Sequence, residues 1–134
     1  MFWLVVTVFW CLAIYYFTEQ PAFNDAHTLR FFYSIGLPEA MIKITDFIVR
    51  KLAHVALFFT LAFFALKAVR YWRWQYLAAW AFAAVYGMTD EWHQLYVPGR
   101  SGKVGDVLID AAGAMICIAI VYLWDKRRQK SKKI

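Results

Sequence analysis

Four stretches of the chain consist of apolar residues without Lys, Arg, Asp or Glu, and polar segments separate them. A helix needs about 20 residues, at about 1.5 Å each, to cross the hydrocarbon of a bilayer. The first stretch comes close to this length, whereas the other three reach it only when ionisable residues at one end are included. We therefore expect four transmembrane helices, over residues 2–19, 48–68, 74–96 and 104–124.

The polar segments have their own pattern. Residues 20–49 alternate aromatic or aliphatic residues with charged ones, which makes this segment too polar to cross a membrane. We expect one or two short interfacial helices there, with a break at Gly36 and Pro38. Residues 125–134 form a basic tail. The predicted fold is a single domain over residues 1–134, an all-α membrane protein built as a four-transmembrane-helix bundle.

Composition supports the bilayer as the solvent of this protein. Hydrophobic residues make up 63% and aromatic residues 20% of 134 residues, which is more apolar surface than a soluble domain of this size buries. The net charge is +6, and the basic tail over residues 125–134 is interpreted as a solvated, lipid-facing cluster in preference to a nucleic-acid-binding segment. Cys11 and Cys117 lie inside apolar stretches and are interpreted as packing residues.

The distribution of charge predicts the orientation. If the chain alternates direction, the end that carries the tail has nine Lys and Arg residues and one acidic residue. The other end has six Lys and Arg residues and eight Asp and Glu residues. An excess of Lys and Arg marks the cytoplasmic side of a membrane protein. We expect the protein to lie in the bacterial inner membrane, with both termini in the cytoplasm and the acid-rich end on the extracytoplasmic side.

Ionisable residues inside three of the spans are spaced to share helix faces. Residues three, four or seven apart lie on one face of a helix. Gly87 and Gly113 lie on two of these faces and would let the helices approach closely. The residues so aligned are Lys51 and His54 on the second span, Asp90, Glu91 and Gln94 on the third, and Asp106 and Asp110 on the fourth.

Burial of these groups demands partners. An Asp or Lys at the centre of a bilayer costs about 2.5 to 3.5 kcal/mol on insertion scales. Asp90 is too short to reach the interface, so it must face other polar groups or water, and we expect Lys51, His54 or Arg100 as its partner. The cost favours a functional site, with a structural network of ion pairs as the alternative.

Five short motifs, in this order along nearly the whole chain, resemble those of the VanZ-like family of bacterial membrane proteins. Two positions depart from that family, because Asp110 lies where Asn is frequent and Cys117 where a second Gly is frequent. The resemblance implies a four-span fold and a link to resistance against the glycopeptide teicoplanin, for which the family is named. The motifs are Phe17-Thr18-Glu19-Gln20, Arg50-Lys51-x-x-His54, Asp90-Glu91-x-x-Gln94, Pro98-Gly99-Arg100 and Asp106-x-x-x-Asp110-x-x-Gly113.

Three functions are compatible with such a site. The first is binding of an anionic envelope lipid or cell-wall precursor, for which guanidinium and ammonium groups are suited. The second adds acid–base chemistry on a lipid-linked phosphate or ester, and the third is transport by a homo-oligomer. The predicted ligand-binding residues are Arg50, Lys51, Gln94, Arg100, Asp106 and Asp110, and the catalytic residues of an enzyme would be His54, Asp90 and Glu91.

A metal-assisted version of the enzyme is also conceivable. It would use four carboxylates, whose oxygens suit Mg²⁺ or Mn²⁺. These are Asp90, Glu91, Asp106 and Asp110. The four-residue spacing of Gly102, Asp106 and Asp110 is by itself too unspecific to assign a metal. The sequence does not identify a cofactor.

Overall fold

The computed structural model describes residues 1–19, 30–31, 33–36, 38–97 and 102–131 of the chain. Helices account for almost all of this part, which contains no β-strand. The four long helices are α1 (Phe2–Glu19), α3 (Glu39–Ala68), α4 (Gln75–Gln94) and α5 (Val104–Ser131).

The predicted helical fold is confirmed, but only three of the four expected transmembrane spans are supported by helix length and hydropathy. Within the described part of the chain, three helices are long and apolar enough to cross a membrane, namely α1, α3 from Met41 onward, and α5. α4 is 20 residues long but carries Asp90 and Glu91 within its length, which lowers its mean hydropathy. Its assignment as a fourth span stays a prediction.

Helix α3 begins nine residues earlier than expected. The segment 39–47, which the sequence suggested as part of a separate interfacial helix, is continuous with the second span. The break does fall where Gly36 adopts a left-handed φ of 77° and Pro38 precedes the helix. Beyond Pro38, Asp46 and Arg50 form an i,i+4 ion pair at 2.9 Å that supports the continuous helix. Before the break, where another interfacial helix was expected, residues 30–31 and 33–34 are helical, and residues 20–29, 32 and 37 lie outside the described residues.

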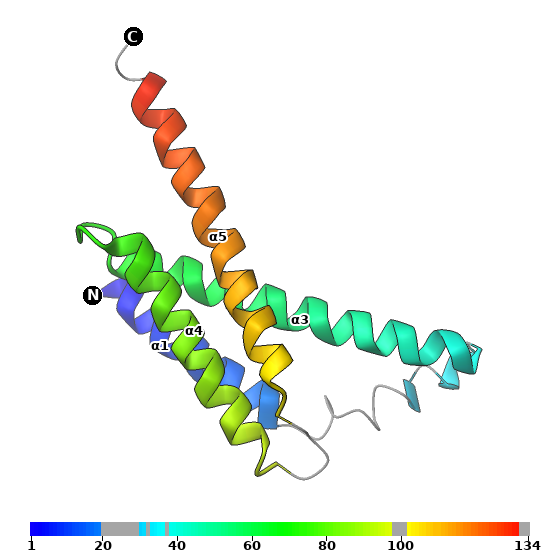
Figure 1. Cartoon of the computed structure of the whole chain (residues 1–134). Helices are drawn as coiled ribbons and strands as arrows, with labels where there is room; N and C mark the ends of the chain where they lie inside the picture. The colour runs from blue at the N-terminus through cyan, green and yellow to red at the C-terminus, as the bar shows by residue number, and fades with distance from the viewer. Residues whose placement is uncertain (20–29, 32, 37, 98–101, 132–134) are drawn as a thin grey trace.

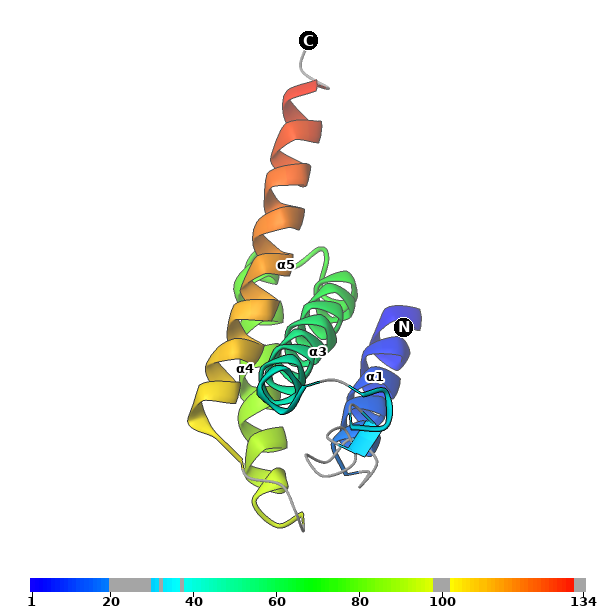
Figure 2. The same ribbon diagram turned by 90° about the vertical axis from the view of Figure 1, so that its right-hand side faces the viewer.

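Helix α3 is the centre of the bundle and contacts each of the other three long helices. Figure 2 shows α3 between α1 on one side and α4 and α5 on the other. In Figure 1, the end of α1, the end of α4 and the start of α5 lie at one end of the molecule, while the N-terminus and the connection from α3 to α4 lie at the other. The alternating chain direction expected from the sequence is therefore present.

Small residues allow the helices to approach closely. A Cβ atom built on Gly113 of α5 would lie 2.7 Å from the carbonyl oxygen of Val55 on α3, so main chain meets main chain at this point. The buried apolar core of the bundle includes Phe58, Leu61 and Ala114. α3 and α5 are thus held at a fixed separation in the middle of the bundle.

Three aromatic side chains fasten the helices to one another through main-chain oxygens. The Trp10 indole donates to the carbonyl of Leu57 at 3.1 Å, and the Trp80 indole donates to the carbonyl of Ala111 at 3.2 Å. The Tyr86 hydroxyl donates to the carbonyl of Cys11 at 2.6 Å. These bonds link α1 to α3, α4 to α5 and α4 to α1. Within apolar surroundings, each also satisfies the polar tip of an aromatic ring.

Candidate functional site

The aligned polar residues of three helices lie together, as their spacing predicted. Four of them are almost completely buried, with exposed fractions of 4% for Asp90, Glu91 and Gln94 and 0% for Asp110. We call the full set the polar site. It consists of Lys51 and His54 on α3, Asp90, Glu91 and Gln94 on α4, and Asp106 and Asp110 on α5.

The centre of the polar site is formed by one residue from each helix. His54 Nδ1 lies 2.9 Å from Asp110 Oδ1, and this is a hydrogen bond. The same nitrogen lies 4.0 Å from Glu91 Oε1. Gly87 makes room for this arrangement, because a Cβ atom there would lie 3.1 Å from the Cβ of Asp110. The three side chains form an enclosed group of one imidazole and two carboxylates.

Lys51 and Asp106 form an ion pair nearer the surface. The ammonium group of Lys51 donates to Asp106 Oδ1, and the two side chains are 22% and 13% exposed. The ammonium also lies over the ring of Phe47, 5.3 Å from its centre. Lys51 is thereby held in place from two sides while part of its side chain stays accessible.

Asp90 faces α1 and α4 through its two oxygens. Its Oδ1 accepts a hydrogen bond from the Thr18 hydroxyl at 2.8 Å, and its Oδ2 accepts one from the Gln94 amide at 2.8 Å. The sequence suggested Lys51, His54 or Arg100 as partners and did not identify Thr18. Thr18 lies in the last turn of the first span, at the level of the polar site, and that position was the available signal.

Glu91 is held by the segment that leads into α5. The main-chain nitrogen of Lys103 donates to Glu91 Oε2 at 2.8 Å. Gly102 packs so closely that an added Cβ atom would collide with the carbonyl oxygen of Glu91. This segment covers the end of α4 and fixes the direction of the Glu91 carboxylate.

The two predicted arginines have different outcomes. Arg50 forms an ion pair with Asp46, one turn earlier on its own helix. Arg100, predicted to bind the anion together with Lys51, lies outside the described residues. Lys51 is therefore the cation of the polar site among the residues that the structure describes, and it is paired with a carboxylate.

The polar site has more buried acceptors than donors. Glu91 Oε1 and Asp110 Oδ2 are buried and have no hydrogen-bond partner among the described residues. One nitrogen of His54 and one oxygen each of Glu91 and Asp110 lie within 4.8 Å of one another, close enough to hold a metal ion together. This set differs from the four carboxylates considered from the sequence, because it includes a histidine.

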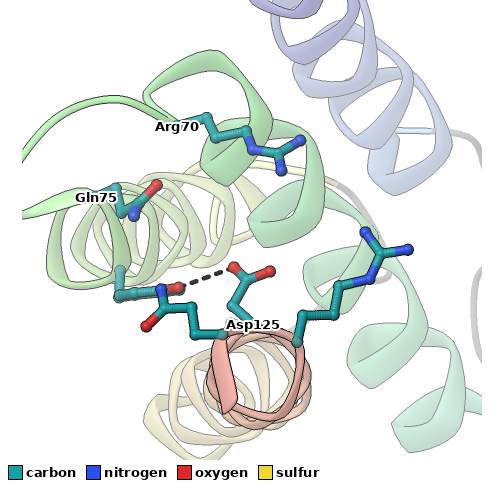
Figure 3. Close-up of a pocket in the computed structure, with 6 residues that line it drawn as sticks. Arg70, Gln75 and Asp125 are labelled. Atoms are coloured by element: carbon teal, nitrogen blue, oxygen red, sulfur yellow. Dashed lines mark hydrogen bonds between the residues drawn. The ribbon is translucent and has the colours of Figure 1, made fainter. Parts of the chain in front are cut away.

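Two cavities lie at the other end of the bundle, and their linings contain no residue of the polar site. One has a volume of about 280 Å³, and Arg70, Tyr76, Asp125 and Arg128 contribute to its lining. Figure 3 shows Arg70 and Asp125 at this cavity. The Tyr76 hydroxyl donates to Asp125 Oδ2 at 2.9 Å. We place the candidate site at the buried carboxylates instead, since buried carboxylate oxygens without a hydrogen-bond partner among the described residues need an explanation that an open surface cavity does not.

Comparison with known proteins identifies the family. A sequence model described as VanZ/LLP1 matches residues 2–125. The searches of curated proteins and of solved structures found no match. The match covers nearly the whole chain, including every described residue of the polar site, and confirms the resemblance seen in the motifs. The chain belongs to the VanZ/LLP1 family.

Proposed function

We propose that this membrane protein binds the anionic head group of an envelope lipid or lipid-linked cell-wall precursor at the polar site. The observation that carries the proposal is the position of Lys51. Its side chain is 22% exposed, while Asp106 and the Phe47 ring hold its ammonium group in one place. An ammonium fixed in advance loses less side-chain entropy when it binds a phosphate or carboxylate.

The membrane arrangement proposed with this function has four spans, with α4 as the third. The charge distribution supports cytoplasmic termini and a polar site that opens toward the outer leaflet of the bacterial inner membrane. A lipid head group at that leaflet would lie at the same depth as the ends of α1 and α4 and the start of α5. The polar site would then be reached from the lipid phase without crossing the bundle.

Labelling of single cysteines tests the orientation. In a variant with Cys11 and Cys117 replaced by Ala, we expect Lys103→Cys to react with a membrane-impermeant thiol reagent on intact cells. Lys130→Cys is the matched control, because both lysines are exposed and they lie at opposite ends of α5. It should react only after the cells are lysed. The reverse result would place the polar site on the cytoplasmic side.

Lipid binding by the purified protein tests the function itself. We expect lipids with a phosphate monoester or another anionic head group to copurify with the protein and to bind it saturably, as measured by native mass spectrometry. Lys51→Gln should weaken this binding about tenfold or more, because a hydrogen bond to a charged group contributes about 1.5–3 kcal/mol. Lys43→Gln is the control, since Lys43 is exposed on the same helix. Equal binding by both variants, or no preference for anionic lipids, would contradict the proposal.

A second candidate function is catalysis on the bound lipid. The hydrogen bond that the Asp110 carboxylate accepts from His54 Nδ1 supports it, because a carboxylate at Nδ1 orients a histidine that acts as an acid or base through its other nitrogen. In that case purified protein would convert a radiolabelled lipid, and His54→Ala would abolish the conversion while Lys51-dependent binding persisted.

A further inference from the structure

We propose that His54, Glu91 and Asp110 form a binding site for a divalent transition-metal ion, with Zn²⁺ or Mn²⁺ as the fitting ions. This inference goes beyond lipid binding and does not depend on it. It starts from the fact that three different helices each contribute one ligand atom to the same buried point. The family model and the motif comparison do not assign a metal to these residues.

The separations between the ligand atoms fit a shared ion. Metal–nitrogen and metal–oxygen bonds of about 2.0–2.2 Å place two ligands of one ion about 3.0–3.5 Å apart. His54 Nδ1 lies 2.9 Å from Asp110 Oδ1 and 4.0 Å from Glu91 Oε1. The two distances fall on either side of that interval, so small rotations of the side chains complete the site without movement of the helices.

The unpartnered oxygens are a separate observation that points to a cation. Glu91 is 4% exposed and Asp110 is 0% exposed, and each has one buried oxygen without a hydrogen-bond partner among the described residues. Buried polar atoms are usually satisfied, and a buried carboxylate without a counter-charge is costly. A divalent ion bound by Glu91 Oε1 and the Asp110 carboxylate would supply the missing positive charge and would offset the acid excess of the polar site.

The surrounding residues hold the ligands as metal sites require. The main-chain nitrogen of Lys103 donates to Glu91 Oε2 at 2.8 Å and leaves Oε1 for the ion. Asp110 packs closely against Gly87, where an added Cβ atom would lie 3.1 Å from the Asp110 Cβ and 3.2 Å from its Oδ2. Contacts of this kind orient the side chains that bind the metal and strengthen metal binding.

The ligand types indicate which ion binds. Imidazole with two carboxylates suits Zn²⁺ and Mn²⁺, whereas Mg²⁺ and Ca²⁺ favour sites made of oxygen alone. Three protein ligands leave at least one position for water or for an oxygen of a bound molecule. The competing explanation is a metal-free His54–Asp110 hydrogen bond that only holds α3 against α5.

Metal titration of the full-length protein in detergent distinguishes these explanations. Metal is first removed with a chelator, and Zn²⁺ or Mn²⁺ is then added. We expect elemental analysis to find one bound ion per chain. With Co²⁺ in place of these ions, the absorption spectrum should be that of an ion bound by nitrogen and oxygen ligands. His54→Ala, Glu91→Gln and Asp110→Asn should each weaken binding at least tenfold. The matched controls are His93→Ala and Asp46→Asn, which change the same residue types at the same end of the bundle and should leave binding unchanged.

Thermal melting provides a second measurement if a variant folds poorly. Saturating Zn²⁺ or Mn²⁺ should raise the melting temperature of the native chain, because an ion that binds only the folded state stabilises it. Glu91→Gln keeps the shape of the side chain and should remove that increase. Absence of stoichiometric binding, binding that survives all three substitutions, or equal losses in the two controls would overturn the proposal. The measurements contain no added lipid, so their outcome is separate from the test of lipid binding.

Discussion

Replacing Gly113 by alanine is expected to lower the free energy of unfolding by about 1–3 kcal/mol, the usual cost of overpacking a well-filled core. Alanine is a better helix former than glycine by about 1 kcal/mol, so propensity alone predicts the opposite sign. The new Cβ atom would lie 2.7 Å from the carbonyl oxygen of Val55 and 3.0 Å from its Cα. Both are main-chain atoms and cannot rotate away, so α5 must separate from α3.

Gly105→Ala is the matched control for this substitution. Gly105 lies on the same helix, and a Cβ atom there would meet nothing within 4 Å. Melting in detergent should therefore show unchanged or slightly increased stability for Gly105→Ala and a clear decrease for Gly113→Ala. A similar effect of both substitutions would mean that the close contact between α3 and α5 does not limit their approach.

Replacing Lys51 by methionine is expected to destabilise the protein by about 3 kcal/mol. That value is at the lower end for a broken buried ion pair, because the Lys51 side chain keeps 22% exposure. The destabilisation comes from Asp106, whose charge would remain inside the bundle without its counter-charge. Thermal melting in detergent measures the loss of stability, and an immunoblot measures the amount of protein in the membrane.

A second substitution separates the structural role of the pair from its functional role. Replacing a buried ion pair by apolar residues of similar size is often neutral or stabilising. We therefore expect Lys51→Met combined with Asp106→Leu to recover most of the stability and none of the anionic-lipid binding. Recovery of both would show that the pair only holds α3 against α5. Failure to recover stability would show that Asp106 has a partner besides Lys51 that matters for folding.

Helical periodicity accounts for most of what the sequence predicts correctly. Lys51 and His54 share a face because they are three residues apart, and the same spacing rule places Asp106 beside Asp110. The cost of burial then forces these faces toward one another, as the ion pair of Lys51 and Asp106 confirms. The convergence of three helices could thus be predicted without knowing their tilt.

Contacts that depend on the relative rotation of helices could not be predicted in the same way. Asp90 and Glu91 are neighbours in sequence, yet one accepts hydrogen bonds from Thr18 and the other lies beside His54. Their spacing is compatible with several partners, and only the packing of α1 against α4 selects among them. The close fit of Gly102 against Glu91 also depends on a turn that no periodic pattern describes.

The early start of α3 has a local cause that the apolar pattern obscured. Charged residues before Arg50 suggested an interfacial segment, but Asp46 and Arg50 neutralise each other one turn apart on the helix. A hydropathy reading counts them as two separate charges. Their pairing makes continuation of the helix compatible with a position close to the membrane.

The indole and phenol hydrogen bonds between helices end on peptide oxygens, which every amino acid supplies. Leu57, Ala111 and Cys11 can therefore change identity during evolution without loss of the acceptor, whereas the donors Trp10, Trp80 and Tyr86 cannot. At these three contacts, natural variation should therefore be found mainly at the accepting residue, while the aromatic donor on the facing helix should be retained.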